Sequence, residues 1–270
     1  MRKYLFFFLL GILGLNSCFF RKSKGEILTV PEIIVEKTMR DSTISRMMIS
    51  QNSADTSVLS LHYQYYLKAD SIWKDSVNQT IAHFVFLSSN FEDLEKKEVK
   101  LSNQFFVSCL DSFHKQALQD YSDAEYSSLW AYDVDCRVLE QDENFITLSN
   151  FIYTFTGGAH GNTYQQYISF DKKTGKELKL SDIVSNLDEF NEIAEKEFRI
   201  ALELGSENFE DLGFWFENNK FSCNDNFYFT ENGINFLFNT YEIGPYAVGQ
   251  VEFSVPYTLS KHLLKIDLTK

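Results

Sequence analysis

Three glycines and a histidine stand together at residues 156–161, with the sequence TGGAHG, directly after an aromatic-rich run. Glycine is the residue that a chain needs where φ is positive or where another group approaches the backbone closely. The stretch therefore predicts a shaped loop that displays His160. This imidazole has two interpretations. It contacts a ligand beside the backbone N–H groups of Gly158 and Ala159, or it holds the loop by hydrogen bonding to a neighbouring carbonyl or carboxylate.

A second shaped segment lies at residues 241–249, with the sequence YEIGPYAVG. Pro245 fixes its own φ and removes a backbone donor, and the flanking glycines permit close approach of other groups. An exposed aromatic ring beside glycines suits a binding edge, so we expect Tyr246 to reach the glycine loop. The alternative is a structural crossover between the last strands. The candidate binding residues are Gly157, Gly158, His160, Gly161 and Tyr246.

Catalysis needs a nucleophile or a metal together with a base within reach. The sequence contains no nucleophile elbow, zinc-protease, P-loop or dinucleotide-binding motif. The acidic pairs Asp133 with Asp135 and Glu92 with Asp93 could be a general acid and base, but solvated strands and turns have the same spacing, and we favour that interpretation. We therefore favour a non-catalytic protein and expect no catalytic residue, metal or cofactor.

The cysteines divide into one near the N-terminus, Cys18, and three in the body of the chain, Cys109, Cys136 and Cys223. An oxidising compartment permits a disulfide, but an odd number leaves at least one thiol unpaired. Cys136 alternates in step with its apolar neighbours, which predicts a buried and inert thiol. The pairing among the three is left open.

The N-terminus has the layout of an export signal. Residues 1–17 begin with two basic residues and continue as an apolar run that is shorter than the about 20 residues of a transmembrane helix. The signal ends in LNSC, which resembles a bacterial lipobox, so we expect Cys18 to be lipidated and residues 18–28 to form a tether. An ordinary secretory signal with an incidental cysteine is the alternative. We expect a cell-envelope protein anchored in the membrane through Cys18, at the outer membrane and facing the periplasm.

The charge balance limits the partners. The chain has 25 basic and 38 acidic residues, a net charge of −13, and removal of the signal with its two basic residues leaves −15. Nucleic acid is disfavoured because its phosphates demand a basic footprint. A cationic partner would be attracted by the field of the whole protein, although acidity also simply keeps an exported protein soluble.

Periodicity predicts an N-terminal sub-domain at residues 29–130. Strands are expected at 27–35 and 57–66 around a polar, serine-rich middle, and amphipathic helices at 71–87 and 102–121. His83 and His114 fall on these helices, where solvated or packing roles are the default.

A C-terminal sub-domain is predicted at residues 131–270. Strands are expected at 132–140, 145–155, 164–170, 177–180, 227–229, 234–239 and 248–255, and helices at 188–204 and 258–264. Apolar residues on both faces of the 145–155 run predict a central strand that is covered on both sides. Helices and hairpins in separate blocks favour an α+β fold, with mixed, mostly antiparallel sheets packed against amphipathic helices in two sub-domains.

Several groups of residues from about position 150 to 264 recur together in order and spacing. They are YTFTGGAHG at 153–161, FD at 170–171, TGK at 174–176, YEI at 241–243, PYA at 245–247 and VPY at 255–257. These groups resemble a pair of bacterial envelope domains, the domains of unknown function 3298 and 4163. The C-terminal sub-domain is 3298-like, and the N-terminal one fits the 4163-like companion in outline.

The resemblance implies partner binding. Similar domains form the extracytoplasmic part of the RsiV anti-sigma factor, which binds lysozyme, and an N-terminal module of the PdaC peptidoglycan deacetylase; in neither is this module the catalytic centre. The sequence shows no sigma-binding segment and no deacetylase domain, so we expect neither activity. The leading hypothesis is a non-catalytic binding module for a cationic protein such as lysozyme, or for a peptidoglycan fragment. The alternatives are an envelope hydrolase acting on peptidoglycan or another glycan, with His160 and nearby carboxylates as acid and base, and a purely structural envelope component.

Overall fold

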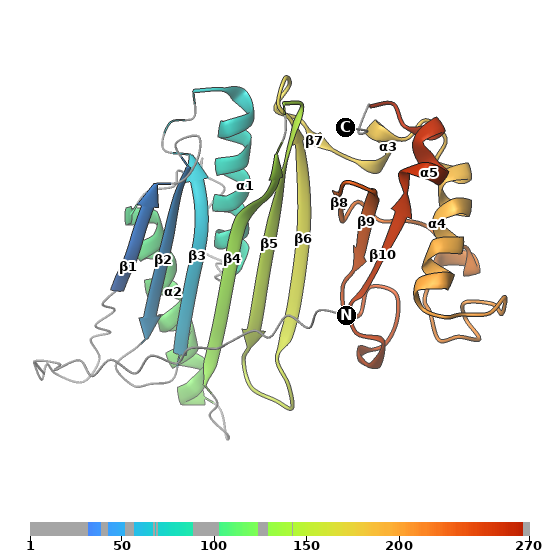
Figure 1. The fold of residues 1–270 in the computed structure, drawn as a ribbon. Helices are drawn as coiled ribbons and strands as arrows, with labels where there is room; N and C mark the ends of the chain where they lie inside the picture. The colour runs from blue at the N-terminus through green and yellow to red at the C-terminus, as the bar shows by residue number, and fades with distance from the viewer. Residues whose placement is uncertain are drawn as a thin grey trace, which may run out of the picture.

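The structure of this chain, a computed structural model, describes residues 32–38, 43–51, 57–66, 68, 70–88, 103–123, 129–141 and 143–266. The predicted signal, the lipidated Cys18 with its tether, and the Glu92–Asp93 pair lie outside these residues. The described part forms two β-sheets with their helices, arranged side by side (Figure 1). None of its helices is long and apolar enough to cross a membrane.

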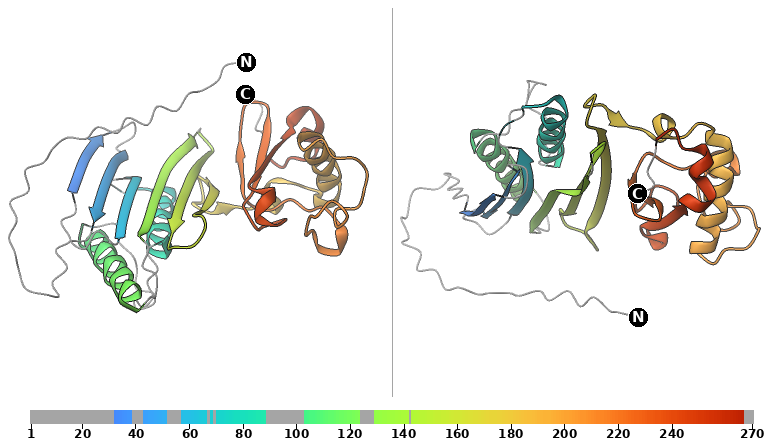
Figure 2. Two further views of the ribbon diagram at one scale, coloured as in Figure 1. Left: turned by 90° about the horizontal axis from the view of Figure 1, so that it is seen from below. Right: turned by 45° about the horizontal axis from the view of Figure 1, so that its top comes forward.

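The larger sheet has seven strands in sequence order. They are β1 (Glu32–Thr38), β2 (Thr43–Gln51), β3 (Ser57–Tyr66), β4 (Trp130–Gln141), β5 (Phe145–Phe155), β6 (Asn162–Asp171) and β7 (Glu177–Leu178). Every pair is antiparallel except β3 with β4, which is parallel with Leu61 opposite Val134. A parallel pair needs a long crossover. Helices α1 (Ile72–Ser88) and α2 (Asn103–Asp123) supply it and lie on one face of the sheet (Figure 2).

The first hydrophobic core lies between this sheet and its two helices. Burial alternates along β3, where Leu59, Leu61 and Tyr63 are buried and Ser60 and His62 are partly exposed. This period of two places one face of the strand against the helices. The helices contribute Val77, Ile81, Val85, Phe113 and Ala117 to the same core. The amphipathic helices predicted from the sequence are therefore confirmed.

The smaller sheet and its helices follow β7 along the chain. The strands are β8 (Phe227–Phe229), β9 (Gly233–Phe238) and β10 (Val251–Pro256), in the antiparallel order β10-β9-β8. The helices are α3 (Leu180–Ile183), α4 (Leu187–Ala201) and α5 (Tyr257–Ser260), with short 3-10 turns η2 (Glu217–Asn219), η3 (Tyr246–Val248) and η4 (Lys261–Leu263). Two mostly antiparallel sheets with helices confirm the predicted α+β class.

Phenylalanine rings fill the second core. Phe198 of α4 is fully buried, and its ring lies 5.1–6.1 Å from those of Phe209, Phe214, Phe216, Phe221, Phe238 and Phe253. Several of these pairs meet edge to face, a geometry that aromatic quadrupoles favour. The many phenylalanines of the sequence are thus used mainly for packing.

Helix α4 shows where local sequence signals hold and where they fail. The side-chain oxygen of Asn186 accepts a hydrogen bond from the backbone N–H of Glu189 at 3.3 Å, so Asn186 is the N-cap of the helix. The helix was expected to run to residue 204, but it ends at Ala201. Glu203 then adopts a positive φ of 54°. The chain turns early because Leu202 and Leu204 pack against the phenylalanine core.

Three further predictions need correction. The serine-rich middle of the N-terminal region contains β2, a strand that its polar composition concealed. The last strand begins at Val251, because Val248 belongs to η3. Only the start of β5 is covered on both sides, since its second half is partly exposed or exposed along the face that carries Phe151.

The predicted division at residue 130 falls inside the larger sheet, because β3 pairs with β4 directly. The two cores meet farther along the chain. Phe145, at the start of β5, packs in the second core, whereas Ile146 packs in the first. β5 and β6 therefore form the part of the larger sheet that supports the smaller one.

Candidate functional site

The glycine loop connects β5 to β6 and is largely exposed. Gly157 and Gly158 have φ values of 103° and 92°, a region that side chains rarely adopt. A Cβ on Gly158 would meet no atom within 4 Å, so conformation rather than packing requires glycine there. The shaped loop predicted from these glycines is present.

Gly161 is required for a different reason. Its φ is not positive, but a Cβ at this position would collide with the ring of Tyr153. Tyr153 lies on β5, and its ring covers the base of the loop while 36% of the residue remains exposed. The absence of a side chain at Gly161 therefore lets an aromatic ring lie beside His160.

His160 makes the loop-holding hydrogen bond that was the second interpretation of this imidazole. Its Nδ1 lies 3.0 Å from the carbonyl oxygen of Gly161, a hydrogen bond that Nδ1–H donates to its own loop. Its ring also stacks on that of Tyr246, with centroids 3.9 Å apart and planes at 19°. Both residues are exposed. The structure therefore unites the two shaped segments that the sequence singled out.

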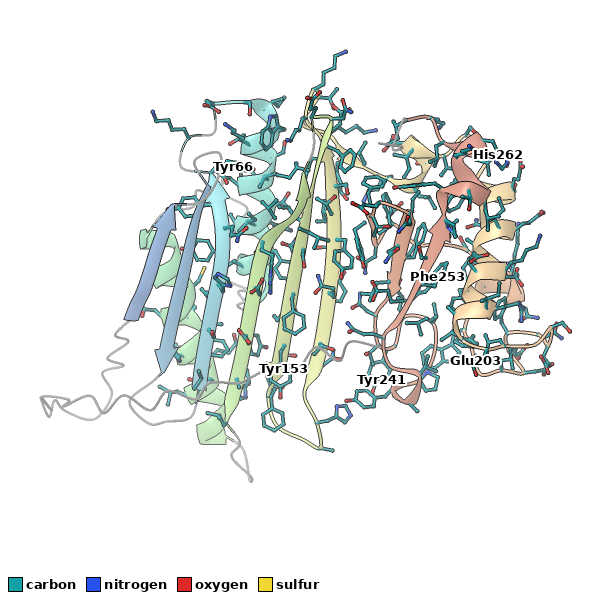
Figure 3. All side chains as sticks on the ribbon, in the orientation of Figure 1. Tyr66, Tyr153, Glu203, Tyr241, Phe253 and His262 are labelled. Carbon is teal, nitrogen blue, oxygen red and sulfur yellow. The ribbon has the colours of Figure 1, made fainter. Side chains whose placement is uncertain are left out.

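Local backbone geometry presents Tyr246. Pro245, with φ of −66°, precedes the 3-10 turn that carries Tyr246, and Gly249 leaves the turn with φ of 72°. Tyr241, a non-glycine residue with φ of 69°, places its ring 5.7 Å from that of Tyr246. Tyr153, His160, Tyr241 and Tyr246 together are called the aromatic patch here. Figure 3 shows Tyr153 and Tyr241 at the same end of the molecule, on either side of the junction between the sheets.

Asparagine side chains join the two sheets beside this patch. The N–H groups of Gln165 and Tyr167 on β6 donate to the amide oxygens of Asn239 and Asn226 at 2.8 and 2.7 Å. Both amides donate in return to the carbonyl oxygen of Gln165 at 2.9 Å. The two side chains thus pair with β6 as a neighbouring strand would, which satisfies an otherwise open strand edge.

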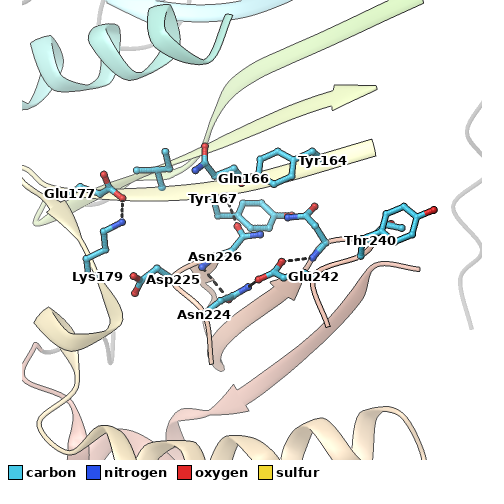
Figure 4. A pocket seen from close by; sticks show the side chains of 13 residues that line it. Tyr164, Gln166, Tyr167, Glu177, Lys179, Asn224, Asp225, Asn226, Thr240 and Glu242 are labelled. Carbon is cyan, nitrogen blue, oxygen red and sulfur yellow. Dashed lines mark hydrogen bonds and ion pairs between the residues drawn. The ribbon is translucent and has the colours of Figure 1, made fainter. Parts of the chain in front are cut away.

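A cavity of about 400 Å³ lies between β6 and the smaller sheet (Figure 4). This inter-sheet cavity is lined by Tyr164, Gln166, Tyr167, Ile168, Glu177, Lys179, Asn224, Asp225, Asn226, Asn239, Thr240, Tyr241 and Glu242. Tyr241 belongs both to this lining and to the aromatic patch, so the two features are continuous. Pockets of about 300–1,000 Å³ are usual for small ligands.

The surroundings of the inter-sheet cavity shift the pKa values of several side chains in and near its lining. Burial, with a smaller contribution from the carboxylate of Glu242, raises the pKa of Tyr164. The hydrogen bond to Glu177 raises the pKa of Lys179. Below the cavity, burial and then the 2.6 Å hydrogen bond to Glu252 raise the pKa of Tyr228 to about 12. These tyrosines are therefore neutral and the lysine is charged near pH 7.

Asp133 and Asp135 lie on the face of β4 opposite the helices, where they differ in environment. Asp135 accepts hydrogen bonds from Arg137 at 2.6 Å and is 2.8 Å from Nδ1 of His62. Burial raises the pKa of Asp133, whereas these two hydrogen bonds outweigh burial and lower the pKa of Asp135. This ion-paired cluster lies on the sheet surface, apart from the lining of the inter-sheet cavity.

The remaining sequence candidates have structural positions. His83 is exposed on α1, whereas His114 is fully buried on α2. Cys109, Cys136 and Cys223 are all free thiols, and Cys109 and Cys136 are buried. Burial raises the pKa of the Cys136 thiol well above its usual range. Within the described residues no group of three or more His, Cys, Asp or Glu side chains is placed to hold a metal ion.

Sequence reasoning missed most of the inter-sheet lining. Asn226 precedes β8 and Asn239 follows β9, so amides at strand ends were the available signal. The sequence analysis included Tyr241 only as a member of the segment 241–249. The positive φ of Tyr241 could not be predicted, because tyrosine rarely adopts that conformation. Tyr164 was predicted only as a strand residue, with no role for its ring.

Comparisons with known proteins agree with this architecture. Residues 178–258 match the model of a protein family of unknown function, DUF3298, and residues 53–163 match the model described as deacetylase PdaC. The glycine loop thus falls in the PdaC match, although the resemblance had assigned it to the 3298-like part. The comparison with curated proteins found no match.

Two crystal structures share the fold. A DUF3298 family member from Bacteroides fragilis is 20% identical with a TM-score of 0.58, covering 89% of this chain and 94% of its own. A DUF3298 family protein from Pseudomonas aeruginosa is 16% identical with a TM-score of 0.55, covering 90% and 95%. The molecule is thus an α+β protein of two adjoining sheets. The family matches show a resemblance to DUF3298 over residues 178–258 and to the PdaC model over residues 53–163, and the two crystal structures share the fold.

Proposed function

We propose that this chain is a lipid-anchored protein of the bacterial cell envelope that binds a partner without catalysing a reaction. The observation that carries the proposal is the stacked, exposed pair of His160 and Tyr246. The pair joins a loop of the larger sheet to a turn beside the smaller one, so it forms one contact surface across the junction. Its flanking rings, Tyr153 and Tyr241, extend that surface.

The aromatic patch suits recognition of a protein. Tyrosine rings supply large contact area at low cost in side-chain entropy, and they are enriched where proteins meet. The hydrogen bond from His160 to Gly161 and the stacking of His160 on Tyr246 both hold the patch in one arrangement. A surface ordered before binding loses less entropy on association.

The charge of the chain favours a cationic partner. A net charge of −13 attracts basic proteins over distances set by the ionic strength. Lysozyme is the test partner because it is basic and because similar domains in RsiV bind it. The anchor follows from the lipobox-like LNSC, and the proposed location is the outer membrane, facing the periplasm.

Binding is tested with the mature chain immobilised and lysozyme in solution, at low and at high salt. We expect binding at low ionic strength that weakens as salt rises. The double variant His160→Ala with Tyr246→Ala should bind at least tenfold more weakly. His262→Ala is the matched control, since Figure 3 places His262 at the opposite end from Tyr241. Absence of binding at low salt would remove lysozyme as the partner, and equal loss in the control would remove the patch.

Two further measurements complete the test. Cys18→Ser should release the protein from the membrane fraction, and retention there would contradict the lipid anchor. Incubation with peptidoglycan should yield no muropeptides from the purified chain. Release of muropeptides that His160→Ala abolishes would instead support a hydrolase and overturn the proposal.

A further inference from the structure

The inter-sheet cavity has an aromatic side and a polar side. Figure 4 shows Tyr164 and Tyr167 on β6, with Asn224 and Asp225 from the segment before β8 and Glu242 from the turn after β9 across the cavity. Tyr164 is 42% exposed although it lines the cavity, so its ring is open to a ligand. The opening is bounded by Tyr241 of the aromatic patch, which is 51% exposed.

The polar side is fixed by its own hydrogen bonds. Asn224 donates both amide hydrogens, one to the carbonyl of Leu237 at 2.8 Å and one to Glu242 at 2.6 Å. The second oxygen of Glu242 accepts from the backbone N–H of Asn239 at 2.7 Å. Asn226 likewise donates to the carbonyls of Gln165 and Leu237. The amide donors at these positions are therefore already used within the protein.

Acceptor capacity remains on the carboxylates. Each carboxylate oxygen can accept about two hydrogen bonds. Each oxygen of Glu242 accepts one, and Oδ1 of Asp225 accepts one from the N–H of Leu180 at 2.8 Å. Lys179, whose ammonium bonds Glu177, adds further hydrogens. A ligand that complements this cavity therefore donates several hydrogen bonds and accepts a few.

Charge narrows the class of ligand. Three carboxylates, on Glu177, Asp225 and Glu242, line the cavity against the single ammonium of Lys179. An anionic ligand would be repelled by this excess. Lys179 is already bonded to Glu177, and a neutral polyhydroxylated ring can donate to the open acceptors of Asp225 and Glu242 without meeting repulsion. Such a ring also has an apolar face of C–H groups that can lie against a tyrosine ring.

We propose that the inter-sheet cavity binds a neutral saccharide of one or two rings, stacked on Tyr164 and hydrogen bonded to Asp225, Glu242 and Lys179. The cavity volume of about 400 Å³ is at the small end of the range for ligand pockets, in keeping with a ligand of this size. The site stands on its own lining and does not depend on the protein contact proposed for the aromatic patch.

The test uses three probes that share one ring and differ in charge. They are N-acetylglucosamine, which is neutral, glucosamine, which is cationic at pH 7, and glucuronate, which is anionic. Binding to the mature chain is measured by saturation-transfer NMR and calorimetry. We expect a Kd on the order of 1 mM for N-acetylglucosamine, set by its small size. Glucuronate should bind at least tenfold more weakly than N-acetylglucosamine, because the excess of carboxylates in the lining repels its charge.

Variants assign the binding to the cavity. Tyr164→Ala should weaken N-acetylglucosamine binding at least tenfold, whereas Tyr164→Phe should retain it because the ring supplies the contact. Trp215→Ala is the control: Trp215 is an exposed aromatic residue outside both the lining and the aromatic patch, and its replacement should leave sugar binding unchanged. An unchanged circular dichroism spectrum and thermal midpoint show that each variant is folded.

The proposals of sugar binding and of protein binding can be refuted independently of each other. Salt should leave the binding of the neutral sugar unchanged but weaken that of lysozyme. No binding of N-acetylglucosamine at ten times the expected Kd would overturn the saccharide site. Binding of glucosamine alone, or equal affinity of wild type and Tyr164→Ala, would overturn it as well. None of these results depends on whether His160 and Tyr246 bind a protein.

Discussion

His114 lies on α2 with its imidazole fully buried, and its Nδ1 is 2.7 Å from the hydroxyl of Ser57, which is also fully buried. Burial lowers the pKa of His114 from 6.5 to about 4, and the nearby carboxylate of Asp111 offsets only part of that effect. The folded protein therefore keeps this imidazole neutral at a pH where the unfolded chain would protonate it.

The sign and size of the consequence follow from linkage. Below pH 6.5 the unfolded state binds a proton that the folded state does not, so stability falls as pH falls from 6.5 toward 4 and is unaffected above this window. With these two pKa values, His114 costs about 2 kcal/mol of unfolding free energy at pH 5 and about 3 kcal/mol at pH 4.

Urea unfolding at pH 8 and pH 5 measures this effect in wild type and in His114→Gln. Glutamine keeps a polar partner for Ser57 but does not titrate. We expect the loss of stability between the two pH values to be about 2 kcal/mol smaller in the variant. His83→Gln on α1 is the matched control, because His83 is exposed and its replacement should leave the pH dependence unchanged.

Other groups also titrate over this range, so the comparison rests on the difference between variants. An equal pH dependence in wild type and His114→Gln would refute the reasoning, since it would mean that the buried imidazole is protonated without cost. An equal change in His83→Gln would refute it too, because burial would not be the cause.

Three other substitutions test the packing around the two sheets, and the free energy of unfolding is the quantity measured for each. Phe198→Ala should cost about 3–5 kcal/mol, because it empties the centre of the second core. Asn226→Ala should cost about 1–3 kcal/mol, because the N–H of Tyr167 loses its acceptor. Asn150→Val should instead stabilise by about 1 kcal/mol, since its buried amide has no hydrogen-bond partner among the described residues and β-branched side chains suit a central strand.

A different result would contradict each of these predictions. Ile200→Ala on the same helix as Phe198 is 69% exposed and should change stability by less than about 0.5 kcal/mol, so a similar cost at both positions would contradict the core assignment. An unchanged stability in Asn226→Ala would show that the amide does not support β6. Destabilisation by Asn150→Val would indicate a buried water or another partner at that amide.

The sequence predicted most elements because local signals and tertiary packing agree there. The helices at 71–87 and 102–121 lie within one or two residues of α1 and α2 at each end, since their apolar stripes face the core that the structure shows. It missed β2, which lies within a polar, serine-rich region and pairs with β3 over its whole length. It also extended the helix at 188–204 too far, because α4 ends at Ala201 and Glu203 then takes a positive φ of 54°.

The candidate site divides in the same way. Glycine and proline report their own backbone needs, so Gly157, Gly158 and Pro245 indicate both shaped segments through their residue types alone. The stacking of His160 on Tyr246 and the need for a bare position beside Tyr153 involve residues that are far apart in the chain or on different elements. Their approach is set by the register of β5 with β6 and by the amide bridges of Asn226 and Asn239.

By itself the sequence determined the α+β class, the acidic charge and the positions of the tight turns, because each depends on composition or on the conformational range of single residues. Only the tertiary structure decided that two sheets meet along β6, with a cavity between them and an aromatic patch at its edge. A cavity is the space that packing leaves unfilled, and its lining here comes from two separate segments of the chain, within residues 164–179 and 224–242. The local conformational preferences of residues cannot predict that two distant segments will pack side by side and leave such a space.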